Sequence, residues 1–237
     1  MERLKSLGYA GFSGGGGDPT ITDRSLADPK DRVQVYELIS DAMAESQHGQ
    51  FAESTEKLKT ALKTDPDSVS VHYLLGLNYY RMHEFPGAVE EFQRVLKFSP
   101  DYTLAVFYLG LAYAQNGNID EAIATLKRTL ELDSTNFAAA FNLGAAYVKK
   151  QMIPEAVAAL RQSITIYPDY VDGQRALGQL LLYQGEDDEA LVHLRQAVAL
   201  APADPGSHAA LARALEKKGL TQEAAEEMRK AQQARPQ

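Results

Sequence analysis

A single period dominates this sequence: the same residue types return every 34 positions from residue 35 to the end of the chain. A Leu-Gly pair marks the period most clearly, with its glycines at Gly76, Gly110, Gly144 and Gly178. An alanine follows each glycine after 12 residues, and columns of tyrosine, of leucine or phenylalanine, and of proline keep the same phase. Such a period predicts a stack of small units, because repeats of about 20–50 residues are typical of solenoids and related arrays.

The period divides the chain into an arm, residues 1–34, and six copies, in which position 1 denotes the first residue of each copy. The arm contains the run Gly14–Gly17, which we expect to be a flexible linker. Gln232 stands at position 28 of the last copy, where the other copies have apolar residues, so we expect a polar C-terminal cap. The copies are residues 35–68, 69–102, 103–136, 137–170, 171–204 and 205–237.

Each copy is predicted to form two helices joined by a turn, because its apolar residues return at helical spacing. The second helix is expected to begin at an aspartate N-cap such as Asp120 or Asp188, or at a proline in the first turn. His83 and Gln151 stand at position 15 of copies two and four, which predicts that their turns close differently. In the other copies position 15 is glycine, which can adopt the left-handed conformation of a helix C-cap: Gly49, Gly117, Gly185 and Gly219.

Composition restricts the chemistry of the chain. Cysteine is absent, which excludes a disulfide scaffold, a thiolate zinc site and a cysteine nucleophile. The formal net charge of -8 argues against nucleic acid as a partner, and no apolar run is long enough for membrane insertion. The five histidines form no i, i+4 pair, so we expect surface or half-buried helix residues and no metal site. We therefore expect no catalytic residues and no cofactor.

The pattern resembles the tetratricopeptide repeat (TPR), in which a Leu-Gly pair, a tyrosine, an alanine, a large apolar residue and a proline recur every 34 residues. The resemblance implies an all-α fold, a right-handed superhelix or α-solenoid of six helical hairpins. It also implies that the first helices line a concave groove that binds an extended peptide or a helix of a partner protein. The residues that carry it in copy two are Leu75, Gly76, Tyr79, Ala88, Phe92 and Pro100.

The resemblance further implies that positions 2, 5, 9, 12 and 13 face the groove. Copies one to four present mostly apolar and aromatic residues at positions 5, 9 and 12, and the columns at positions 5 and 9 are not needed for the hairpin core. Arg175 marks the change to polar residues, and we expect it to meet an acidic group of a ligand. The predicted partner groove consists of Ile39, Met43, Tyr73, Leu77, Tyr80, Phe107, Leu111, Phe141, Ala145, Val148 and Arg175.

We therefore expect a non-catalytic scaffold that binds a protein or peptide with apolar side chains. Two alternatives remain open. Residues 3–12, followed by the glycine linker and Leu26–Ser40, resemble the junction between a bacterial sulfatase-like hydrolase and a C-terminal TPR tail. That resemblance implies an accessory tail acting in cis; the second alternative is a homo-oligomerisation module. The compartment stays undefined, cytoplasmic or, if an upstream signal is missing, periplasmic.

Overall fold

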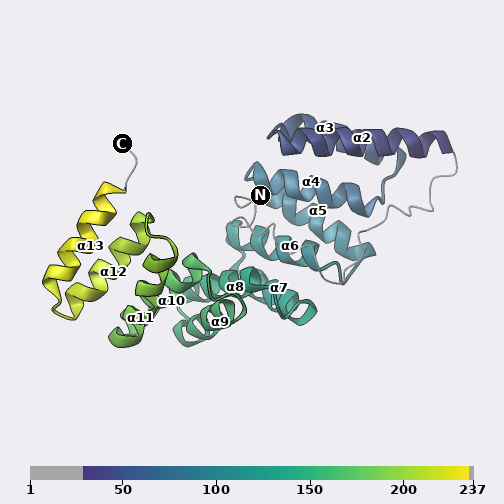
Figure 1. Ribbon diagram of the computed structural model, residues 1–237. Coiled ribbons are helices and arrows are strands. Elements are labelled where there is room, and N and C mark those ends of the chain that lie inside the picture. The colour runs from purple at the N-terminus through teal and green to yellow at the C-terminus, as the bar shows by residue number, and fades with distance from the viewer. Residues whose placement is uncertain (1–28, 235–237) are drawn as a thin grey trace. The chain divides into compact units, whose positions relative to one another are not determined.

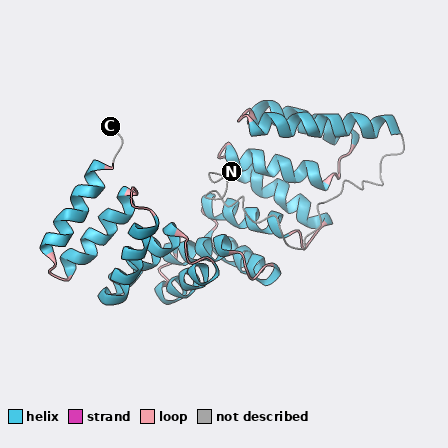
Figure 2. Cartoon of the chain, in the orientation of Figure 1, coloured by secondary structure: helices cyan, strands magenta, loops and turns pink. Residues whose placement is uncertain are grey.

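The computed structural model describes residues 29–234, and these residues form twelve helices and no strand (Figure 1, Figure 2). The all-helical fold class expected from the repeats is confirmed. None of the described helices is long and apolar enough to cross a membrane. The helices are α2 (Pro29–Gln47), α3 (Phe51–Thr64), α4 (Val69–Arg81), α5 (Phe85–Phe98), α6 (Thr103–Gln115), α7 (Ile119–Leu132), α8 (Phe137–Lys149), α9 (Ile153–Ile166), α10 (Val171–Gln184), α11 (Asp187–Leu200), α12 (Pro205–Lys217) and α13 (Thr221–Gln233).

Consecutive helices pair as hairpins, beginning with α2 and α3 and ending with α12 and α13. The hairpins fall into two compact units, unit 1 up to Leu132 and unit 2 from Asp133. Within unit 1, α3 packs on α4 and α5 on α6; within unit 2, α9 packs on α10 and α11 on α12. Helix α2 begins at Pro29, before the first copy as the period defines it. The rest of the predicted arm lies outside the described residues.

The Leu-Gly column marks a close helix crossing inside the hairpins. A Cβ atom added at Gly76 would lie 2.7 Å from the Phe92 ring, and one at Gly178 would lie 2.6 Å from Leu194 Cγ. Packed carbon atoms normally stay about 3.5–4.0 Å apart, so glycine is what lets these helices approach. The same relation joins Gly110 to Leu126 and Gly144 to Leu160.

All six hairpin turns close through a left-handed residue. The four glycines at position 15 have φ between 76° and 86°. The prediction that His83 and Gln151 close their turns differently is wrong, because their φ values are 60° and 59°. The following backbone N–H donates to the carbonyl of Tyr79 at 2.8 Å and of Tyr147 at 3.0 Å. These bonds satisfy the carbonyls at the helix end and hold two non-glycine residues in a conformation that costs about 1–2 kcal/mol.

The second helices begin earlier than their aspartates predict. Helix α7 begins one residue before Asp120, and the N-cap of α11 is Glu186, so Asp120 and Asp188 lie in the first turn. Their carboxylates there act on the helix dipole and are not N-caps. Side-chain caps occur instead at two first helices: Asn136 before α8 and Asp204 before α12 accept a backbone N–H at 2.8 and 2.7 Å.

Both end hairpins have polar outer faces. Val71 and Leu75 of α4 are 0% and 1% exposed and belong to the cluster that includes the α3 side chains. Their counterparts in α2 are Glu37 and Asp41, and both are exposed. At the other end, Gln232 of α13 is exposed, as the predicted C-terminal cap requires. The outer face of each end hairpin therefore carries polar side chains that are exposed to solvent.

Candidate protein-interaction surface

In unit 1 the predicted groove residues of copies two and three lie on the first helices α4 and α6. Tyr73, Leu77 and Tyr80 pack against the buried cluster around Phe92. The expectation that position 5 is not needed for the core is therefore wrong for Tyr73. Each predicted residue is partly exposed, namely Tyr73, Leu77, Tyr80, Phe107 and Leu111.

Tyr108 of α6 connects the aromatic side chains of this surface. Its ring centroid lies 6.4 Å from that of Tyr73, 6.0 Å from that of Tyr80 and 5.5 Å from that of Phe107. It also stacks on Phe92, with the centroids 6.0 Å apart. Tyr108 is not among the residues predicted to line the groove. An aromatic residue at position 6, directly after the predicted groove residue Phe107, is the sequence signal that identifies it.

Copy one contributes less than expected. Ile39 does not line a groove, because it is 4% exposed and packs with Val35 and Leu58 in the core. Met43 is 45% exposed, one turn further along α2.

In unit 2, Phe141 of α8 is partly buried against Tyr170, with ring centroids 5.1 Å apart. Burial, together with the nearby Asp172 carboxylate, raises the pKa of Tyr170 to about 12, so its phenol stays neutral. Ala145 and Val148, further along α8, are exposed. The partly exposed aromatic side chains of this helix, Phe137 and Phe141, therefore lie toward its N-terminal end, whereas Tyr147 is buried.

Arg175 of α10 is already engaged within the protein. Its guanidinium donates to Asp204 at 2.6 Å and also to Asp172. Asp204 in turn caps α12 by accepting from the backbone N–H and the hydroxyl of Ser207 at 2.7 and 2.6 Å. Arg175 is predicted to meet an acidic group of a ligand. In the structure its guanidinium already binds two carboxylates of its own unit.

These contacts share one geometry, which we call the position-5 joint. The side chain at position 5 of a hairpin meets the N-cap residue of the next hairpin's first helix. In unit 1 Tyr73 meets Tyr102, with ring centroids 5.1 Å apart, and in unit 2 Arg175 meets Asp204. A third example is the contact between the rings of Phe141 at position 5 and Tyr170, the N-cap residue of α10.

The histidines differ from the expectation of surface or half-buried positions. His48 and His83 are exposed and His193 is intermediate, but His72 and His208 are only 2% and 3% exposed. The two buried residues occupy position 4. Within residues 29–234, no group of three His, Asp or Glu side chains is arranged to hold a metal ion.

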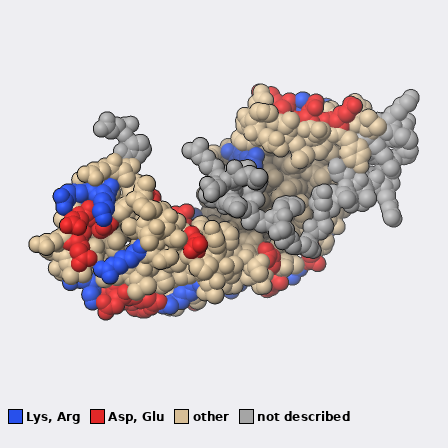
Figure 3. Space-filling model, in the orientation of Figure 1, with Lys and Arg blue, Asp and Glu red and all other residues tan. Residues whose placement is uncertain are grey.

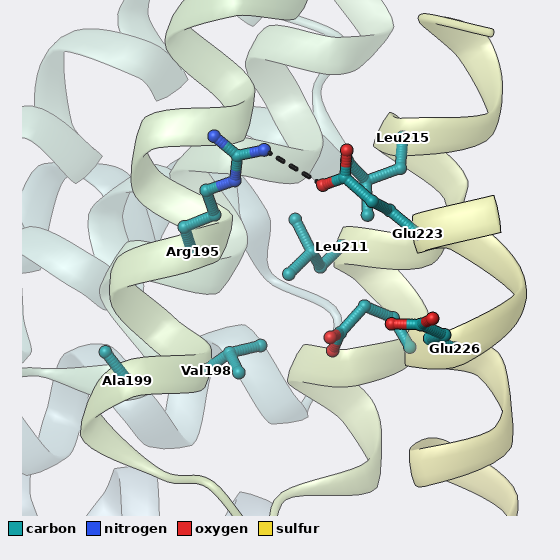
Figure 4. Close-up of a pocket in the computed structure, with 8 residues that line it drawn as sticks. Arg195, Val198, Ala199, Leu211, Leu215, Glu223 and Glu226 are labelled. Carbon is teal, nitrogen blue, oxygen red and sulfur yellow. Dashed lines mark hydrogen bonds and ion pairs between the residues drawn. The ribbon is translucent and has the colours of Figure 1, made fainter. Parts of the chain in front are cut away.

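A cavity of about 300 Å³ lies between α11, α12 and α13 (Figure 4). Val198, Leu211 and Leu215 form part of its lining, and Arg195 pairs with Glu223 at 3.3 Å (Figure 4). Over these C-terminal helices acidic and basic side chains lie close together (Figure 3). The cavity thus combines a small apolar floor with a rim whose charges are largely paired, unlike the uncharged aromatic surface of unit 1.

Family models identify this architecture. Two tetratricopeptide repeat models match residues 73–137 and 107–171, and residues 205–237. A TPR repeat model matches residues 44–83 and 178–219. Together these matches cover most of the chain, so it belongs to the tetratricopeptide repeat family. A search of the curated proteins gives no match.

Solved structures agree with the family. A crystal structure of MamA is 28% identical and has a TM-score of 0.63, over 68% of this chain and 94% of that one. PilF of Pseudomonas aeruginosa is 17% identical with a TM-score of 0.73, over 84% of this chain and 90% of that one. YrrB, described as a TPR protein with an unusual peptide-binding site, is 18% identical with a TM-score of 0.63, over 77% and 94% of the two chains. At these identities PilF and YrrB show a shared fold.

Proposed function

We propose that this chain is a protein-interaction scaffold whose unit 1 binds an uncharged, apolar segment of a partner protein on α4 and α6. The TPR fold supports the general part of this proposal, because stacked hairpins are typical of protein-binding scaffolds. The specific part rests on one observation: the partly exposed aromatic and leucine side chains on these two helices. Exposed apolar patches of this kind usually mark interaction sites.

Charge favours α4 and α6 over α10 and α12 as the binding surface. At positions 5, 9 and 12 of α4 and α6 every side chain is uncharged. The same positions of α10 and α12 include Arg175, Arg213 and Glu216. A charged ligand group would lose hydration over α4 and α6 without gaining a partner, so the surface selects an uncharged ligand.

Phe107 and Leu111 are the best anchors for such a ligand. They lie one helical turn apart on α6 and are therefore neighbours on its surface. The buried cluster that holds Tyr73 and Tyr80 does not include them within the described residues. Their exposed area is thus available to the apolar side chains of an extended peptide or of one face of an amphipathic helix.

The test combines peptide selection with two variants. Peptides selected from a displayed library of random 12-residue sequences should be apolar, and Phe107→Ala should weaken their binding by about 2 kcal/mol, roughly 30-fold. Phe107→Ala should cost much less folding stability than Tyr113→Ala, the matched control. Tyr113 packs against the core, and its hydroxyl accepts from Gln93 Nε2 at 2.7 Å.

Other outcomes separate the alternatives. Selected peptides that bind Phe107→Ala and Leu111→Ser as well as the unaltered chain contradict the proposal. A synthetic peptide of residues 1–17 that competes with them identifies the chain's own arm as the natural occupant. Concentration-dependent dimers that Phe107→Ala abolishes identify a second copy instead.

A further inference from the structure

His72 of α4 occupies an unusual buried position in unit 1. Its Nδ1 lies 2.6 Å from Glu91 Oε2 of α5, and its Nε2 lies 2.9 Å from the backbone oxygen of Pro66. The side chain is 2% exposed. A single ring therefore connects the turn after α3 to the second helix of the next hairpin.

The number of protons on the His72 ring determines whether it can form hydrogen bonds to both Glu91 and Pro66. A backbone carbonyl only accepts hydrogen bonds, and so does an ionised carboxylate. A neutral imidazole has one N–H and can satisfy only one of the two. The imidazolium ion has an N–H on each ring nitrogen, so it donates to Glu91 and to Pro66 at the same time.

The same arrangement recurs in unit 2. His208 Nδ1 lies 2.5 Å from Glu227 Oε2 of α13, and its Nε2 lies 2.9 Å from the backbone oxygen of Pro202. Both histidines occupy position 4, both glutamates position 23 and both prolines position 32. Two independent copies of one geometry argue that the contact is built into the repeat.

Copy five makes the corresponding contacts without an ion. Gln174 donates from Nε2 to the backbone oxygen of Pro168 at 2.8 Å, and its Oε1 accepts from His193 Nδ1 at 2.7 Å. A glutamine amide is donor and acceptor at once, so its two contacts need no added proton. The other nitrogen of the His193 ring, Nε2, lies 3.5 Å from Glu189 Oε1. The chain thus contains one form of the link that requires an imidazolium ion and one form that does not.

We propose that His72 and His208 are proton-dependent latches, each of which holds consecutive hairpins together as an imidazolium ion and loosens that joint when it loses a proton. Deprotonation leaves a carbonyl or a carboxylate facing a ring nitrogen that has no hydrogen to donate. Because each latch spans a hairpin joint, its release should reduce the stability of the joint between α3 and α4 or between α11 and α12.

The Glu91 carboxylate favours the His72 imidazolium ion, whereas the Arg94 guanidinium opposes it. Glu91 and Arg94 of α5 face His72, and Asp65 precedes the proline whose carbonyl it contacts. Burial lowers the pKa of His72, but the hydrogen bonds to Glu91 and Pro66 outweigh it and raise this pKa above its ordinary value. The stabilisation is therefore complete below a pH of about 6.5 and lost as pH rises through the raised pKa.

The second latch has a similar environment. Glu227 faces His208 from α13 and also accepts from Lys230 at 2.7 Å. Burial opposes ionisation of Glu227, but Lys230 and His208 outweigh it and lower the pKa of this carboxyl. Glu227 therefore stays ionised at neutral pH and presents His208 with an acceptor.

The direct test is the protonation state of the two rings in the intact chain, measured by ¹⁵N NMR of the histidine side chains between pH 6 and 9. We expect both nitrogens of His72 to carry hydrogen at pH 7, and its titration midpoint to lie above the ordinary value of about 6.5. A single neutral tautomer for both rings at pH 6.5 overturns the proposal.

A paired substitution taken from copy five provides the matched variant. His72→Gln with Glu91→His reproduces the Gln174–His193 pair at the first latch. Burial lowers the pKa of His193, so a pair of that kind loses stability as pH falls. Urea unfolding of the intact chain should show a midpoint that falls with rising pH, and the paired variant should weaken or reverse that dependence. An unchanged pH dependence contradicts the latch; if the variant does not fold, the NMR titration alone decides.

Discussion

The position-5 joint has opposite chemistry in two regions of this molecule. In unit 1 Tyr73 packs on Tyr102, within an aromatic group that also includes Phe92 and Tyr108. In unit 2 Arg175 pairs with Asp204 across the same two positions of the repeat. The backbone geometry of the repeat is therefore maintained independently of the chemistry at this joint, which varies between hairpins.

The two joints should differ in strength. Aromatic rings that leave water contribute through their buried area and through ring contacts, and salt hardly affects them. The Arg175 and Asp204 side chains are 27% and 29% exposed, so solvent and salt screen their attraction. An ion pair of this exposure contributes about 1 kcal/mol or less.

Removal of the Tyr73 ring should have the largest effect. Tyr73→Ala loses contacts with Phe92, Tyr102 and Tyr108 at once and should lower the free energy of unfolding by about 3 kcal/mol. Urea unfolding followed by tyrosine fluorescence measures this loss. Hydrogen exchange should locate the loosened amides in α4 to α6.

Tyr73→Phe is the control, because it keeps the ring and removes only the hydroxyl. If Tyr73→Ala lowers the free energy of unfolding by less than about 1 kcal/mol, contacts other than the position-5 joint stabilise unit 1. In that case the comparison between the two regions would not depend on position 5.

The glycine crossings compare the two regions at a second point. A methyl group at Gly76 would come within 2.9 Å of three atoms of the Phe92 ring, and one at Gly178 would meet the Leu194 side chain and the carbonyl of Ala190. Overpacking costs about 1–3 kcal/mol, and the better helix propensity of alanine returns about 1 kcal/mol. We expect both Gly76→Ala and Gly178→Ala to be destabilising, by up to about 2 kcal/mol.

Gly76→Ala should be the more costly of the two. The Phe92 ring contacts the rings of both Tyr73 and Tyr108, so it has less freedom to move than Leu194. Thermal unfolding of both variants measures the difference. Stabilisation by either substitution would show that the helices separate easily and that the crossing is not tightly packed.

The sequence predicts the helices and crossings well because they depend on columns that repeat. Glycine at position 8 and the large residue at position 24 meet in every internal hairpin, so the period alone identifies the contact. The prediction for the turns at His83 and Gln151 is wrong because it treats the preference of the left-handed position for glycine as a requirement. Their position in the repeat outweighs the residue's own preference for the right-handed region.

The candidate surface was less predictable because its contacts join columns that vary between copies. Tyr73 meets Tyr102 across a hairpin boundary, whereas Phe107, at the same position, has Asn136 at the corresponding N-cap. The burial of His72 depends on an acceptor at position 23 and a carbonyl at position 32. Such pairings depend on spatial neighbours that a single sequence does not identify.

The smallest effect should come from the ionic joint. Arg175→Met keeps most of the side-chain volume and removes the charge, so it should lower the free energy of unfolding by about 0.5–1 kcal/mol. Asp204→Ala should cost more, about 1–2 kcal/mol, because it also removes the N-cap of α12. Burial opposes ionisation of Asp204, but its bonds to Ser207 and the Arg175 charge lower its pKa, so this contribution is lost as pH falls below about 4.

Salt separates the ionic joint from the aromatic one. The effect of Arg175→Met should shrink in 1 M NaCl, where the screening length is about 3 Å, and the effect of Tyr73→Ala should persist there. Gly206→Ala is a structural check, because its methyl group would lie 2.9 Å from the Arg175 Nη1 atom and should displace the guanidinium. Gly206→Ala should therefore lower the free energy of unfolding more at low salt than in 1 M NaCl, as Arg175→Met does. Equal effects of Arg175→Met at low and high salt, measured by urea unfolding, would mean that the arginine acts through its aliphatic stem, and the two joints would then share one apolar mechanism.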